Sequence, residues 1–89
     1  MSRSLMLKEY ADHTVLREHL EQAQRHVTDG QLHVQRQRAV IRRLEHGGYD
    51  SREAHWFLGT IEDLLRMHVR ERDRLSELVW MQAETLSGV

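Results

Sequence analysis

Apolar residues recur in steps of three and four along two stretches of the chain, on either side of Gly47 and Gly48. This spacing keeps one stripe of side chains on the same side of a helix, and it is the heptad pattern of a coiled coil. Before the glycines, the stripe consists of Leu16, Leu20, Ala23, Val27, Gly30, Val34, Gln37, Ile41 and Leu44. After them, it consists of Ala54, Leu58, Ile61, Leu65, His68, Arg72, Leu75, Val79 and Gln82. The sequence therefore predicts an all-α protein with two long helices.

Local signals place the ends of these helices. The predicted division is an N-terminal segment 1–13 that is partly helical or flexible, a helix 14–46, a turn 47–50, a helix 51–84 and a tail 85–89. Thr14 or Asp12 is a suitable N-cap for the first helix, because a short polar side chain can accept a hydrogen bond from the first turn. Ser4 is an alternative cap, and it would make residues 5–11 helical as well.

The short connection favours an antiparallel hairpin. Gly47 stands where a left-handed residue would end the first helix. Asp50 followed by Glu53 is typical of a capping box at the start of the second helix, with Tyr49 and Ala54 as the hydrophobic staple. Two helices of similar length joined by so short a turn pack side by side in opposite directions.

Folding the two stripes together about the turn predicts which residues face each other. Val34 is expected to meet Leu65, and Gly30 is expected to face His68, where the missing side chain would leave room for the imidazole. A polar layer of this kind often fixes the register of a coiled coil at some cost in stability.

The two flanks of this seam differ in character. One flank is nearly all polar, whereas the other is half apolar and too wide for a single partner helix to cover. A small chain without disulfides often completes its core by association. We therefore predict a homodimer that forms a four-helix bundle. The predicted interface residues are Phe57, Leu64, Leu78, His19, His26, His33 and Val40.

Three of the seven histidines lie seven residues apart, at His19, His26 and His33. Successive members are about 10 Å apart along a helix, which is too far for two of them to hold one metal ion. The favoured interpretation is that they border the interface, with His26 across from Glu71, and no cofactor is predicted. Two alternatives stay open. One is a metal or haem site across the dimer that uses His26, His33 or His68, and the other is a pH-responsive assembly.

The composition argues against several other classes of function. The net charge is −1, and there is no cysteine to form a disulfide, a thiolate metal site or a nucleophile. No apolar run approaches the length of a membrane span, so we expect a cytoplasmic protein with no membrane partner. The basic cluster of Arg36, Arg38, Arg42 and Arg43 is the basis of a weaker hypothesis, nucleic-acid association. The near-neutral net charge favours a solvated helix surface instead.

An enzyme is not expected, since there is no glycine-rich phosphate loop and a narrow bundle has little concave volume. Trp56 and Trp80 fall outside the seam and its apolar flank, where they mark a partner site or are covered by Leu5–Leu7 and Tyr10. The predicted function is thus a self-associating structural or protein-interaction module, whose further protein partner the sequence does not identify.

Short motifs spread along residues 16–78 also resemble those of a known group of proteins. They are His19-Leu20, Arg25-His26-Val27, Gly30, His33-Val34, Arg36-Gln37-Arg38, Ile41, Leu44-Glu45, Gly48-Tyr49-Asp50, His68 and Arg72-Asp73-Arg74-Leu75. With this spacing the chain resembles a group of short uncharacterised α-proteobacterial proteins. The resemblance implies a bacterial, cytosolic, stand-alone hairpin. The group has no assigned activity, so the resemblance transfers no functional residue.

Overall fold

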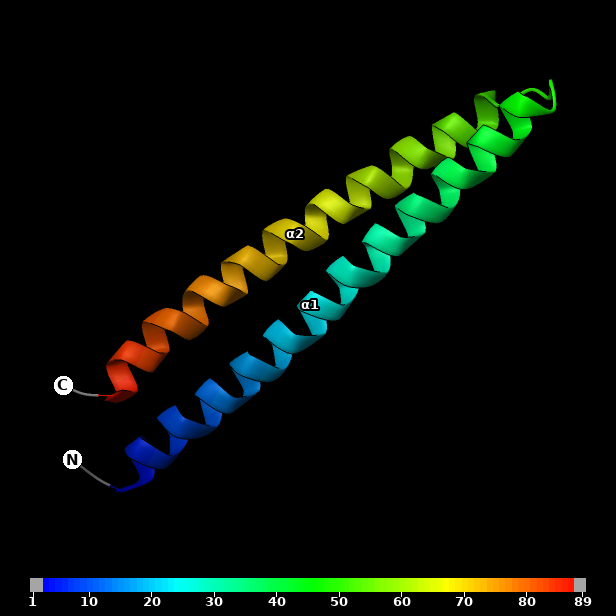
Figure 1. The fold of residues 1–89 in the computed structure, drawn as a ribbon. Helices are drawn as coiled ribbons and strands as arrows, with labels where there is room; N and C mark the ends of the chain where they lie inside the picture. Colours follow the sequence, from blue (N-terminus) through cyan, green and yellow to red (C-terminus); the bar gives the residue numbers. More distant parts are fainter. Residues whose placement is uncertain (1–2, 88–89) are drawn as a thin grey trace.

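The protein is a straight antiparallel helical hairpin. The computed structural model describes the backbone of residues 3–87, together with the side chains of Lys8 and of residues 11–87. Helix α1 spans Arg3–His46 and helix α2 spans Arg52–Ser87. The two helices lie side by side along their whole length (Figure 1), and the hairpin measures 70 × 15 × 14 Å. The predicted all-α hairpin is confirmed.

Both helices are longer than the sequence analysis predicted. Helix α1 begins at Arg3, close to the alternative start at Ser4, so the expected segment 1–13 continues the helix from its third residue. Helix α2 ends at Ser87 and takes in the first part of the expected tail. Neither added segment contains proline or glycine, and leucine, methionine and alanine favour a helix. The remaining tail residues 88–89 lie outside the described part of the chain.

The turn ends α1 with a Schellman motif, one residue later than predicted. The left-handed residue is Gly48, with φ of 76°, rather than Gly47. The backbone N–H of Tyr49 donates to the carbonyl of Leu44 at 2.8 Å, and that of Gly48 donates to the carbonyl of Glu45 at 3.1 Å. These two bonds satisfy carbonyls that the last helical turn would otherwise leave without partners.

The carboxylate of Asp50 caps the N-terminus of helix α2. That carboxylate accepts a hydrogen bond from the backbone N–H of Arg52 at 3.0 Å and pairs with its guanidinium at 2.8 Å. Hydrogen bonds from Arg52 lower the pKa of Asp50, and the same pairing raises the pKa of Arg52. The predicted staple between Tyr49 and Ala54 is replaced by another contact, because the Tyr49 ring lies against Gly47 and is largely exposed.

The core is a single row of side chains between the helices. Its buried members all belong to the predicted seam, which confirms the choice of inward-facing positions. They are Ala23, Val27, Val34 and Ile41 from α1, with Ile61 and Leu75 from α2.

The layer at Gly30 differs from the prediction. A Cβ atom added to Gly30 would lie 3.0 Å from Leu65 Cδ1, so the space above this glycine is filled by Leu65 rather than by His68. The residue that faces Gly30 is therefore one helical turn closer to the connection than expected. The reason is that knobs pack into holes between neighbouring positions of the facing helix, whereas the prediction paired positions head-on.

Candidate self-association face

One long side of the hairpin carries large apolar side chains that the described chain covers only in part. Phe57 is 42% exposed, Leu64 48% and Leu78 37%, and they follow one another at heptad spacings along α2. Met67 and Met81 lie on the adjoining row and are also exposed. We call these five residues the α2 apolar face. The sequence analysis found its first three members but not the methionines, although their spacing of three residues from Leu64 and Leu78 was a sufficient signal.

The histidine row of α1 borders this face. His19, His26 and His33 are all exposed. The ring of His33 meets the ring of Phe57 edge-on, with 6.4 Å between their centroids. The bordering position that the sequence predicted for His33 is thus present within one hairpin.

The most specific contact in the row joins the two helices. The rings of His26 and His68 lie with their centroids 5.1 Å apart and their planes tilted by 51°. His68 is available for this contact because Leu65 occupies the space above Gly30. The expected position of His26 across from Glu71 does not produce an ion pair, since Glu71 pairs with Arg74 at 2.6 Å.

Of the three histidines considered as metal ligands, the structure brings two together. His26 and His68 are in contact, whereas His33 contacts Phe57. Among the described residues, no group of three or more histidine, aspartate or glutamate side chains is placed to hold a metal ion. One hairpin alone therefore offers at most a pair of imidazoles.

The other flank of the seam is polar, as predicted, and it ties the helices together. Arg38 pairs with Glu62 at 3.0 Å, and His55 lies 3.6 Å from Glu45. The Gln37 amide donates to the backbone carbonyl of Ala54 at 3.0 Å. Both cross-helix ion pairs among the described residues thus lie on this flank.

An open groove runs along the polar flank, although the sequence analysis expected little concave volume. Its volume is about 740 Å³, and it is lined partly by Val34, Leu65 and Val69 and partly by Arg38 and Glu62.

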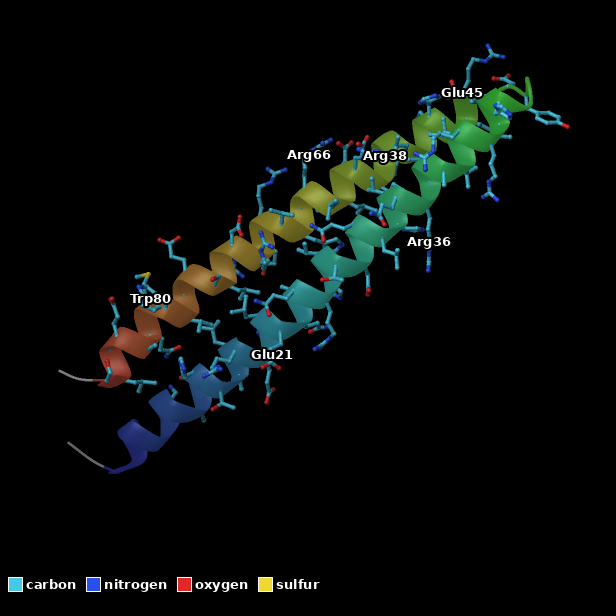
Figure 2. All side chains as sticks on the ribbon, in the orientation of Figure 1. Glu21, Arg36, Arg38, Glu45, Arg66 and Trp80 are labelled. Atoms are coloured by element: carbon cyan, nitrogen blue, oxygen red, sulfur yellow. The ribbon has the colours of Figure 1, made fainter. Side chains whose placement is uncertain are left out.

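The basic cluster is divided between different sides of α1. Arg38 is paired with Glu62, whereas Arg36 points away from α2 (Figure 2). Arg42 and Arg43 line a separate hollow near the turn. A phosphate backbone needs several cations on one surface, so this arrangement gives the nucleic-acid hypothesis little support.

Both tryptophans lie on the outside of the hairpin. Trp56 and Trp80 are largely exposed, and Trp80 is on the outer side of α2 in Figure 2. The cover that the sequence analysis suggested for Trp80, Leu5–Leu7 with Tyr10, lies outside the described side chains. The exposure of Trp80 itself means that most of its ring is accessible to a partner.

Comparisons with protein-family models, with curated proteins and with solved structures find no match for this chain. The resemblance to α-proteobacterial proteins accordingly stays a prediction. Within residues 3–87, neither helix contains a stretch long and apolar enough to cross a membrane. Function must therefore be argued from the surface of the hairpin itself.

Proposed function

We propose that this protein is a non-enzymatic self-association module, in which two hairpins join through the α2 apolar face and the histidine row to form a four-helix bundle. The observation that carries the proposal is the exposure of Phe57, Leu64 and Leu78 in one line. Monomeric proteins rarely expose contiguous apolar patches of this kind, and larger ones mark interaction sites.

The hairpin also has little core of its own. Its buried hydrophobic residues form one row, and even the least exposed, Val27, retains 3% of its accessible surface. A chain of 89 residues without disulfides has few other sources of stability. Pairing the apolar flanks of two hairpins would give one core to which four helices contribute side chains.

Charge distribution favours a second copy as the occupant. The row Phe57, Leu64, Glu71 and Leu78 contains one charged residue, and the row of His19, His26, His33 and Val40 contains none when the histidines are neutral. Charged residues make up 30% of the whole chain. A strip with a single acidic residue that combines a bulky apolar row with a flatter imidazole row is self-complementary, since each row of one copy can meet the other row of its partner.

The dimensions of the face approach those of a standard dimer interface. From Phe57 to Met81 the face extends about 36 Å along the helix, and the hairpin is 15 Å wide. A flat strip of this size covers about 540 Å², and its accessible surface is larger because side chains protrude, whereas a standard interface buries about 800 Å² per partner.

The test is sedimentation equilibrium of metal-free protein from about 1 to 100 μM, a range that spans ordinary dimer affinities, together with thermal unfolding over the same range. We expect the mass of a dimer at the upper concentrations and an unfolding midpoint that rises with concentration, since association stabilises the folded state. A monomer mass throughout, with a constant midpoint, would overturn the proposal.

A further inference from the structure

The two imidazoles that meet between α1 and α2 have the separation of zinc ligands. A Zn–N bond of about 2.1 Å places the centre of a coordinated imidazole about 3.2 Å from the metal, so two such rings at the tetrahedral angle lie about 5.2 Å apart. The rings of His26 and His68 are 5.1 Å apart. The two ring centroids are therefore already at the separation that a shared cation requires.

The surroundings of the pair leave both rings available. Among the described residues, neither imidazole has a hydrogen-bond or ion-pair partner, and the two rings contact each other. The carboxylate nearest in sequence on α2, Glu71, is already paired with Arg74. His26 is exposed and His68 is half-buried, so the pair lies at the edge of the seam, on the flank that carries the α2 apolar face.

We propose that a divalent cation of the Zn²⁺ class is held between two copies of the hairpin by four imidazoles, His26 and His68 of each chain. This inference rests on the proposed self-association through the same flank. A twofold axis parallel to the helices keeps every layer of one copy level with the same layer of the other. The second His26–His68 pair therefore arrives at the height of the first and completes a tetrahedral set.

The experiment is a calorimetric titration of the metal-stripped protein with ZnCl₂, followed by sedimentation equilibrium of each titrated sample. We expect one Zn²⁺ for every two chains, with the metal confined to the dimer. His26→Gln and His68→Gln should each weaken Zn²⁺ binding at least about 100-fold, as loss of a direct ligand exceeds the loss of an outer-shell partner. His46→Gln is the matched control, since it removes an exposed imidazole of the same helix that lies outside the interface rows, and it should leave the affinity unchanged.

The outcomes separate this site from the dimer itself. If the wild-type protein is a dimer and does not bind Zn²⁺, or if His46→Gln weakens binding as much as His26→Gln, the metal site is refuted while self-association stands. One Zn²⁺ per chain on a monomer would overturn both proposals. Circular dichroism of each variant confirms that it is folded.

Discussion

Leu64 is the residue at which the proposed interface can be tested most quantitatively. It is 48% exposed in the isolated hairpin, and complete burial of a leucine is worth about 2 kcal/mol. Dimerisation can therefore gain about 1 kcal/mol from Leu64 in each copy, or about 2 kcal/mol per dimer. Leu64→Gln removes that gain and buries an amide, which costs about 1 kcal/mol more per copy where it finds no partner. The total of about 2–4 kcal/mol raises the dimer dissociation constant from about 30-fold to several hundred-fold.

The matched control is Leu32→Gln. Leu32 is a leucine of nearly equal exposure, 42%, but it lies in the middle of α1 away from the predicted interface rows. Both variants exchange leucine for glutamine in a helix, so they alter helix propensity equally. Sedimentation equilibrium should show a weakened dimer for Leu64→Gln and an affinity within about twofold of the wild type for Leu32→Gln. Equal losses, or a larger loss for Leu32→Gln, would show that the α2 apolar face is not the interface.

Two further predictions concern the turn between the helices, with a glycine inside α2 as the comparison. Gly48→Ala should lower the free energy of unfolding by about 1 kcal/mol, because alanine is strained at positive φ. Gly59→Ala should raise that free energy by about the same amount through helix propensity, since a Cβ atom at Gly59 meets no atom within 4 Å. Urea unfolding measures both changes, and destabilisation by both variants would contradict the assignment of Gly48 as the left-handed residue and of Gly59 as an ordinary helical one. The lowered pKa of Asp50 means that its pairing with Arg52 stabilises the fold above the ordinary value of 3.8, and that this stabilisation is lost as pH falls through the folded-state pKa. Asp50→Asn should therefore unfold at a lower temperature than the wild type at neutral pH and at nearly the same temperature in strong acid, and a difference independent of pH would refute this linkage.

The sequence was sufficient for the seam but not for the packing of each of its layers. Val34 and Ile61 are buried where the heptads placed them, since periodicity alone decides which side of a helix faces inward. Periodicity does not decide how far one helix slides along the other. Nor does it decide which side chain fills a given hole, and the hole at Gly30 holds Leu65 rather than His68.

The different packing at Gly30 also hid the most specific contact of the candidate site. The sequence analysis assigned His68 to the space above Gly30, so it predicted no contact between the imidazoles of His68 and His26. The two residues were therefore separate candidates for metal ligands. Once Leu65 takes that space, His68 turns to the flank and the contact with His26 follows. A residue pair that joins two helices depends on their relative shift, so it becomes visible only in three dimensions.

The contrast between the flanks sets the size of the proposed assembly. The polar flank holds the cross-helix pairs Arg38–Glu62 and Glu45–His55, and its charges would have to be desolvated before a further hairpin could dock there. The apolar flank is the one whose burial is favourable. An association that uses the same single face on both copies is isologous and closes on itself. We therefore expect assembly to stop at two hairpins, with both polar flanks facing solvent on the outside of the bundle.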